Sequence, residues 1–347
     1  MRNVMLASLR SISGLVAFFL LFAVATNAQQ LPRSVTVASN PPGTVFYALA
    51  SGLSKIVSDG APMQMVVQPY SGTSTFLPLL DAGEIDFGIN NAVDMALSYQ
   101  GPDRLKIGGR NPFQHTPNAR LVMRGAILMT AFLVRKDAPI KTIQDIRGKR
   151  VTGEYPAQLA NWYNVFGFLA GAGMKFEDVK IVPVPGANEG VDALIQGRAD
   201  VALHAVDSAK VKEADAAIGV RHISLDCSAQ GEKRLRAAVP GYYPHWLKRG
   251  QAAGITDDTC VNAYDIYLTS HKGVPDRVVS TVLKNIWDNI DKLTPLHPSF
   301  KDWTRQRAVD ADVTMPYHPA AVQFFKEQGT WPASMDEVQR KLLSLTP

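Results

Sequence analysis

Apolar strand-like segments alternate with amphipathic helical segments along the chain, and short polar loops join them. Residues 35–38 predict a buried strand, after which apolar side chains recur at the spacing of one helical face from Phe46 to Val57. The same order of strand, polar loop and helix returns within residues 63–90. Such alternation predicts an α/β architecture in which helices cover a mainly parallel sheet.

The order of strand, loop and helix appears again within residues 149–203, which indicates a second unit built like the first. In both halves a helix ends at a glycine, Gly83 or Gly197, and an aspartate follows three residues later, just before a strand. Two long apolar runs, 126–134 and 261–270, are placed to join the halves. We therefore expect two α/β lobes connected by two hinge crossings.

The expected boundaries follow from these runs. We predict a first part of lobe I at 29–130, lobe II at 131–264, and a return to lobe I at 265–347. The last segment carries amphipathic helical patterns with aromatic residues, which we expect to pack on the first lobe.

Residues 1–28 have the three-part layout of a secretory signal peptide. Arg2 and Arg10 precede or flank an apolar stretch at 12–25, and the small residue Ala28 stands at the expected cleavage position. The apolar stretch is shorter than the about 20 residues that a membrane-spanning helix needs. We therefore expect an exported, periplasmic protein without a membrane anchor.

The charge balance argues against a polyanionic partner. The chain has a formal net charge of +5, and removal of Arg2 and Arg10 with the leader lowers it to about +3, with acids and bases interleaved along the sequence. Nucleic-acid binding depends on clustered positive charge. We expect no nucleic-acid partner.

The two cysteines, Cys227 and Cys260, become informative if the chain is exported, because an oxidising compartment favours pairing. We consider a disulfide between them, with two separately buried thiols as the alternative. No neighbouring histidine supports a metal site.

Catalytic signatures are missing from the sequence. It contains no His-Glu-x-x-His, Gly-x-Ser-x-Gly, P-loop or Gly-x-Gly-x-x-Gly motif, and the seven histidines show no metal-ligand spacing. We therefore expect a protein that is not an enzyme and that carries no cofactor or catalytic metal.

The motifs along the chain resemble those of the TAXI family, the solute receptors of TRAP transporters, which have the type II periplasmic binding protein fold. The segments that carry the resemblance are 39–47, 70–74, 83–91 and 197–202. The glycine-to-aspartate turn and the two-lobe plan are shared with the wider superfamily of nitrate, sulfonate and pyrimidine receptors.

The resemblance implies a small ligand, usually bearing a carboxylate, that is held between the lobes and handed to TRAP membrane subunits. An amino acid or an organic acid fits this description, and we expect a monomeric receptor. Two alternatives stay open: a periplasmic receptor that reports to a membrane sensor, and a receptor for a superfamily ligand such as a sulfonate, nitrate or pyrimidine.

Residues of the first half match the family's motifs one by one. The start of the first helix is matched by Thr44, Phe46 and Tyr47; the small polar turn after the second strand by Gly72, Thr73 and Ser74; and the amide after the third strand by Asn91. The chain departs from the family at Phe76, where asparagine is frequent, and at 154–158, which replaces a Ser-Gly-Thr turn. Ligand identity is therefore not carried over.

The chemistry of these loops supports an anion site. Three loops between a strand and a helix, at 39–45, 70–75 and 153–158, place helix N-termini beyond the carboxyl ends of the strands. Such termini present unpaired N–H groups that suit a carboxylate. Asn40 and Ser71 join the candidates, although the hydroxyl residues of the second loop could serve as helix caps alone.

The second half supplies five more candidates. Glu154 suits a ligand ammonium or is a solvated loop residue, and His204 contacts ligand or is a buried hydrogen-bonded histidine. Tyr155 lies in a loop, where its ring could form a pocket wall. Gln158 and Asp207 complete the predicted set.

Overall fold

A computed structural model describes residues 30–346, and the predicted signal peptide lies outside these residues. The chain from Leu31 onward forms one compact unit. No helix between residues 30 and 346 combines the length and apolar character needed to cross a bilayer.

The main sheet has eight strands and is mixed. The order β2-β1-β3-β10-β4-β7 runs across it, with β8 added to β4 and β9 added to β10. The strands are β1 (Ser34–Ser39), β2 (Gln64–Pro69), β3 (Phe87–Asn91), β4 (Ala119–Arg135), β7 (Ala202–Ala205), β8 (Val220–His222), β9 (Tyr243–Leu247) and β10 (Thr259–His271). The α/β prediction is confirmed, with one correction to the sheet. Only β1 with its two neighbours pairs in parallel, because β10 runs antiparallel to β3, β4 and β9.

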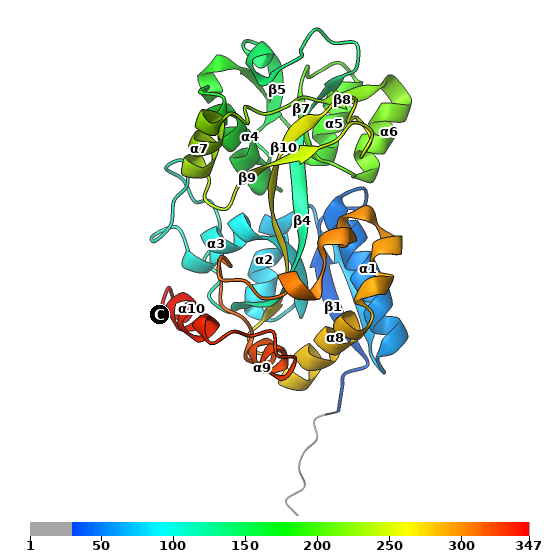
Figure 1. Ribbon diagram of the computed structural model, residues 1–347, viewed down its shortest axis with the longest axis vertical. Helices are drawn as coiled ribbons and strands as arrows, with labels where there is room; N and C mark the ends of the chain where they lie inside the picture. The colour runs from blue at the N-terminus through cyan, green and yellow to red at the C-terminus, as the bar shows by residue number, and fades with distance from the viewer. Residues whose placement is uncertain (1–29, 347) are drawn as a thin grey trace, which may run out of the picture. The chain divides into compact units, whose positions relative to one another are not determined.

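Two long strands, β4 and β10, run side by side through both halves of the molecule (Figure 1). They have 17 and 13 residues and contain the predicted hinge crossings. A chain that crosses to a second lobe and returns must run in opposite directions, which makes this pair antiparallel. The register shifts between Asp265 and Tyr267, near the middle of β10. The predicted lobe boundaries inside these strands remain a prediction.

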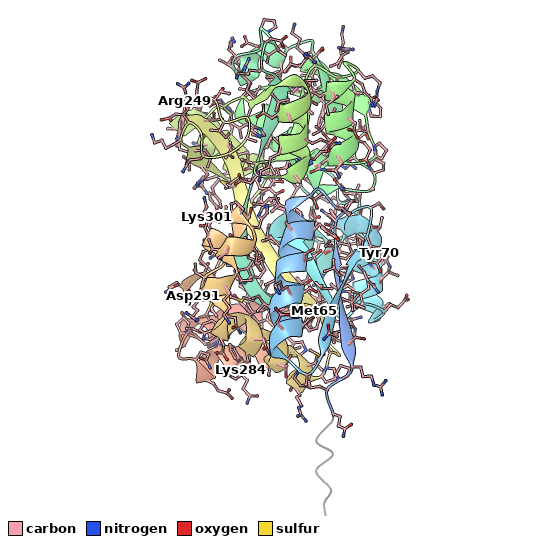
Figure 2. All side chains as sticks on the ribbon, turned by 90° about the vertical axis from the view of Figure 1, so that its right-hand side faces the viewer. Met65, Tyr70, Arg249, Lys284, Asp291 and Lys301 are labelled. Carbon is pink, nitrogen blue, oxygen red and sulfur yellow. A yellow bond between two sulfur atoms is a disulfide. The ribbon has the colours of Figure 1, made fainter. Side chains whose placement is uncertain are left out.

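The first lobe consists of β1, β2, β3 and the helices that cover them. Its helices are α1 (Val45–Gly60), α2 (Thr73–Ala82), α3 (Ala92–Gln100), α8 (Asp276–Asp288), α9 (Pro319–Glu327) and α10 (Ser334–Leu343). The helical face predicted from Phe46 onward is buried, with Leu49 and Leu53 fully enclosed. The chain after β10 packs on this lobe, and Lys284, Asp291 and Lys301 lie at its level in Figure 2.

The second lobe is an insertion between β4 and β10. It contains β5 (Arg150–Gly153), β6 (Lys180–Pro183), α4 (Ala160–Gly171), α5 (Ala187–Ile195), α6 (Ala209–Ile218) and α7 (Ala229–Ala238), together with β7 and β8. Strands β5 and β6 pair in parallel, and a bridge from Val151 to Val201 connects them to the chain that leads into β7. Its core is separate from that of the first lobe and centres on residues such as Phe168.

Short 3-10 turns complete the fold at η1 (Ile143–Ile146), η2 (Phe176–Asp178), η3 (Ile290–Lys292), η4 (Thr294–Leu296), η5 (Pro298–Asp302) and η6 (Arg305–Arg307). A disulfide joins Cys227, which follows β8, to Cys260 at the start of β10. It ties the last part of the second lobe to the strand that leads back to the first lobe.

Candidate functional site

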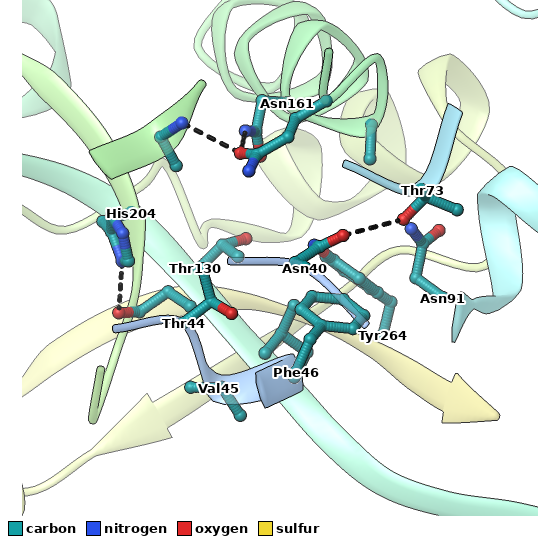
Figure 3. A pocket seen from close by; sticks show the side chains of 15 residues that line it. Asn40, Thr44, Val45, Phe46, Thr73, Asn91, Thr130, Asn161, His204 and Tyr264 are labelled. Carbon is teal, nitrogen blue, oxygen red and sulfur yellow. Dashed lines mark hydrogen bonds between the residues drawn. The ribbon is translucent and has the colours of Figure 1, made fainter. Parts of the chain in front are cut away.

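A small cavity lies between the two lobes and is bordered by both (Figure 3). Its volume is about 40 Å³, far below the roughly 300–1,000 Å³ of pockets that hold drug-sized ligands. Its 15 lining residues are Asn40, Thr44, Val45, Phe46, Thr73 and Asn91 of the first lobe, Gln158, Ala160, Asn161, Ala187, His204 and Ala205 of the second, and Leu128, Thr130 and Tyr264 of the long strands.

The cavity is the meeting point of five helix N-termini. Thr44 caps α1, Asn91 caps α3, and Thr73, Ala160 and Ala187 are the first residues of α2, α4 and α5. All five helices follow a strand that pairs in parallel, so their starts gather at the carboxyl ends of β1, β2, β3, β5 and β6. Each terminus adds partial positive charge and N–H donors. The arrangement favours an anion.

No lysine, arginine, aspartate or glutamate is among the 15 lining residues. His204 does not supply a positive charge either, because burial lowers its pKa to about 4. Its Nε2 lies 3.0 Å from Asn188 Oδ1, and its Nδ1 lies 3.2 Å from the carbonyl of Ala205. The attraction for an anion therefore comes from the backbone.

A polar cluster on the long strands holds one wall of the cavity. Thr130 Oγ1 donates to Asn164 Oδ1 at 2.9 Å, and Asn164 Nδ2 donates to the carbonyl of Ala160 at 3.1 Å and more weakly to Tyr264 Oη at 3.4 Å. Asn262 Nδ2 lies 3.3 Å from Thr130 Oγ1. The sequence prediction missed Thr130 and Tyr264. The signal was present, since both are polar interruptions of the long apolar runs.

Half of the predicted site residues border the cavity. These are Asn40, Thr44, Phe46, Thr73, Asn91, Gln158 and His204. Thr73 Oγ1 points to Asn40 Oδ1 at 3.4 Å, which joins the first two loops of the first lobe. Gln158 Oε1 accepts from the N–H of Ala187 at 2.9 Å and from Asn161 Nδ2 at 3.0 Å.

Three other predicted residues lie at the contact between the lobes instead. Ser74 Oγ donates to the carbonyl of Ala157 at 2.6 Å, and the carbonyl of Ser71 accepts from Gln158 Nε2 at 3.1 Å. At Gly72, an added Cβ would stand 1.7 Å from the Ala157 carbonyl oxygen. These contacts hold the start of α2 against the loop before α4, and they close the cleft on one side.

The remaining predicted residues are not brought to the cavity. Tyr155 is buried in the second-lobe core, where its hydroxyl lies 2.7 Å from Thr152 Oγ1. Glu154 is exposed, with a left-handed φ of 63°. Asp207 also has a left-handed φ, of 65°, and lies near His297 and Lys301 of the first-lobe side. Tyr47 is half-buried on α1.

A second bridge between the lobes was not foreseen. The loop at 101–118, between α3 and β4, brings the Arg110 guanidinium to 4.3 Å from the ring centre of Trp162 on α4. Tyr163 Oη donates to the carbonyl of Arg110 at 3.2 Å. Trp162 also stacks with Phe166 and with Phe176, each at a ring-centre distance of 5.2 Å. We call residues 101–118 the strap. The strap contacts α4 through Arg110.

Comparison with known proteins assigns the chain to a family. The sequence pattern of the NMT1-like family matches residues 37–329. The chain belongs to the NMT1-like family. Among curated proteins, none gives a significant match to this member of the family. The resemblance to the TAXI subfamily stays a prediction.

Solved structures share the fold of this NMT1-like chain. Rpa4515 of R. palustris with adipate is 14% identical, with 91% of this chain and 99% of that chain covered and a TM-score of 0.55. MatC of Rhodopseudomonas palustris with bound malate is 13% identical, with 91% and 100% covered and a TM-score of 0.54. The periplasmic binding protein BugD is 12% identical, with 91% and 97% covered and a TM-score of 0.55. The chain therefore has the two-lobed fold of periplasmic solute-binding proteins.

Proposed function

We propose that this chain is an extracytoplasmic solute receptor that binds a small, carboxylate-bearing ligand, an amino acid or an organic acid, between its lobes. The observation that carries the proposal is the meeting of five helix N-termini from both lobes at one cavity without lysine or arginine. Backbone N–H groups can hold a carboxylate there without a cationic side chain. Adipate and malate in proteins of the same fold are consistent with this class of ligand.

Capture proceeds by closure of the two lobes. The cavity is too small for a ligand of several heavy atoms to enter as the lobes stand, so binding requires them to separate first. Ligand contacts from both lobes then favour the closed arrangement over the open one. The contacts of Ser74 and Gln158 across the cleft add to the closed state.

Delivery to a TRAP-type membrane permease is the finer part of the proposal, and it rests on the resemblance of the loop motifs. The receptor acts in the periplasm, as a monomer and without catalysis of its own. Belonging to the NMT1-like family supports solute binding in general. A sulfonate, nitrate or pyrimidine ligand is the alternative within the same fold, and output to a membrane sensor is the alternative to transport.

The test begins with native mass spectrometry of gently purified protein to identify a ligand that co-purifies. The identified compound is then added back to stripped protein, and at a hundredfold excess over Kd it should raise the free energy of unfolding by about 2.7 kcal/mol. X-ray scattering should show a more compact particle with ligand. A bound compound that is turned over, or tight binding without any change in scattering, contradicts the proposal.

A further inference from the structure

Asp94 is a buried carboxylate behind the cavity, and nothing in the function described so far uses it. It is the third residue of α3, and its side chain is 0% exposed. The side chains of Asn91 and Thr73 approach its carboxylate, but within residues 30–346 neither oxygen has a hydrogen bond of full geometry. Its own N–H donates to Asn91 Oδ1 at 2.8 Å, which caps the helix.

Within residues 30–346, the pKa of Asp94 is set by burial and by the side chains of Asn91 and Thr73, and no cationic side chain contributes to it. Its charge in turn affects the pKa of Tyr163 on α4, Tyr242 before β9 and Tyr264 on β10. Burial raises the pKa of Asp94 to about 7, while the neighbouring Asn91 and Thr73 side chains counteract part of this rise. A buried carboxylate is costly without a cationic partner, and Asp94 has none among the described residues.

That partner has a place to bind. Thr73 and Asn91 both interact with the carboxyl group of Asp94, and both line the cavity. Figure 3 shows these two side chains next to each other at the cavity. The amide nitrogen of Asn91 also has no hydrogen bond of full geometry within the described residues. Side chains of a helix lean toward its N-terminus, which directs Asp94 toward this end of the cavity. Asp94 does not itself line the cavity, but Thr73 and Asn91 line it and interact with the carboxyl group of Asp94.

We propose that Asp94 is the counter-charge for an ammonium group of the ligand, bound beside Thr73 and Asn91, so that the receptor takes amino acids in preference to simple organic acids. This inference rests on the proposed function, because the ligand carboxylate would lie at the N-termini of α1, α4 and α5. The ligand ammonium would lie at the starts of α2 and α3, where the negative charge of Asp94 counteracts the positive helix ends. A second ligand carboxylate at the Asp94 end would meet a like charge. Asp94 is a positioning residue here, since it acts through its two neighbours.

Matched ligand pairs test the inference by calorimetry. Each pair is an amino acid and the same acid without its amine: L-glutamate and glutarate, L-leucine and 4-methylpentanoate, L-alanine and propanoate. We expect at least one amino acid to bind about 100-fold tighter than its partner acid. Asp94→Asn should reduce that preference below about tenfold, whereas Asp103→Asn, the same change at an exposed position, should leave it unaltered.

Two further readouts separate this role from a structural one. Without ligand, Asp94→Asn should raise the melting temperature at pH 8, because the substitution removes a buried negative charge that has no cationic partner. If the variant is more stable and yet binds amino acids more weakly, the weaker binding does not come from a damaged fold. Ammonium binding stabilises the ionised carboxylate, so amino-acid affinity should increase from pH 6 to pH 8, and calorimetry in two buffers should detect proton release.

The outcomes are distinguishable. An acid without an amine that binds as tightly as its amino acid, or an affinity that falls between pH 6 and 8, overturns the role of Asp94 and leaves the receptor function standing. Binding by neither member of any pair overturns the inference and contradicts the proposed carboxylate ligand as well.

Discussion

Single residues set how closely the two lobes approach. Gly72 is the clearest case, because its missing side chain lets the start of α2 touch the carbonyl of Ala157 across the cleft. Its φ of 174° is extended backbone, so the glycine is needed for space and not for conformation. Ser71 and Ser74, which flank it, make hydrogen bonds across the same contact.

Substitution of Gly72 by alanine should weaken ligand binding about 10- to 100-fold, because overpacking of the contact costs about 1–3 kcal/mol in the closed state. Gly171→Ala is the matched control, since its Cβ would meet Leu235 at an ordinary 3.6 Å. Calorimetry with the co-purified ligand measures the affinity. Equal binding by both variants would show that the lobes do not close as seen here.

Buried histidines make the fold sensitive to acid. Burial lowers the pKa of His222 to about 4, below its ordinary value of 6.5, and the contact with the backbone of Phe132 counteracts only part of this shift. The unfolded chain therefore binds a proton between pH 6.5 and 4 that the folded chain does not, and stability falls as pH falls through that window.

Replacement of His222 by glutamine should reduce this acid sensitivity. The difference in unfolding free energy between pH 6.5 and 4 should shrink by up to about 3 kcal/mol relative to the parent chain. Asp94 titrates with the opposite sign, but it is present in both proteins and cancels in the comparison. Urea unfolding at several pH values measures the slopes, and parallel slopes would contradict the assignment.

Most of the predicted residues that border the cavity lie where a strand ends and a helix begins. Thr44, Thr73 and Asn91 were found this way, because loops after parallel strands must gather at one edge of the sheet. Tyr155 follows a strand too, but its ring turns into the core, where Thr152 satisfies its hydroxyl. The position of a residue in a loop does not determine whether its side chain points into the cavity or into the core. Packing against the neighbouring elements determines that direction.

At the scale of elements, the disulfide reinforces a contact that the backbone already makes, since the N–H of Leu225 donates to the carbonyl of Cys260 at 3.0 Å. Cys227 follows β8 and Cys260 is the second residue of β10, at a sequence separation of 33. The enclosed segment contains α7 and β9, which pack on α4 and β10. Closing such a loop restricts the unfolded chain, which stabilises the folded one.

Joint replacement of Cys227 and Cys260 by serine should lower the free energy of unfolding by about 3–4 kcal/mol, the value expected for a loop of this length. Urea unfolding with and without a reducing agent measures the effect. The reducing agent should destabilise the parent chain and leave the double variant unchanged. If the reducing agent changes the free energy of unfolding of neither protein, the disulfide does not contribute to stability.

The strap at 101–118 contacts the second lobe through the Arg110 guanidinium over Trp162. Such a contact contributes about 0.5–2 kcal/mol. Arg110→Ala should weaken ligand binding roughly 2- to 30-fold and increase hydrogen exchange in the strap. Arg249→Ala, at an exposed position of the second lobe, should do neither. Unchanged exchange in Arg110→Ala would contradict a bridging role.

Elements were predicted from the sequence better than their pairing. The apolar runs at 126–134 and 261–270 identified β4 and β10, but nothing local revealed that they pair with each other and make the sheet mixed. Likewise, Arg110 and Trp162 lie in unrelated segments. Contacts of this kind depend on the whole topology and leave no periodic signal in either segment.

At the scale of the whole molecule, the two lobes share the β4 and β10 pair and so are not independent. The core of the first lobe includes residues at the first-lobe end of both strands, and Phe132 of β4 belongs to the second core. Loss of one lobe would remove the sheet neighbours of the other. Opening of the cleft must therefore bend these two strands, and the register shift near Asp265 is where β10 is least regular.

Thermal unfolding should therefore show one cooperative transition by calorimetry, with a van't Hoff enthalpy close to the calorimetric one. Saturating ligand should move that single transition upward as a whole. Two transitions, with only one of them shifted by ligand, would mean that the lobes unfold separately and that the shared strands do not couple them.

The late position of β10 in the chain has a consequence for how the protein is made. Strands β1 to β3 and the first-lobe part of β4 leave the ribosome early, yet the strand that joins them arrives only after the whole second lobe has been synthesised. Until then the nascent first half exposes unpaired apolar edges that can associate with other chains. The yield of native protein should thus depend on how long these edges stay unpaired before β10 arrives.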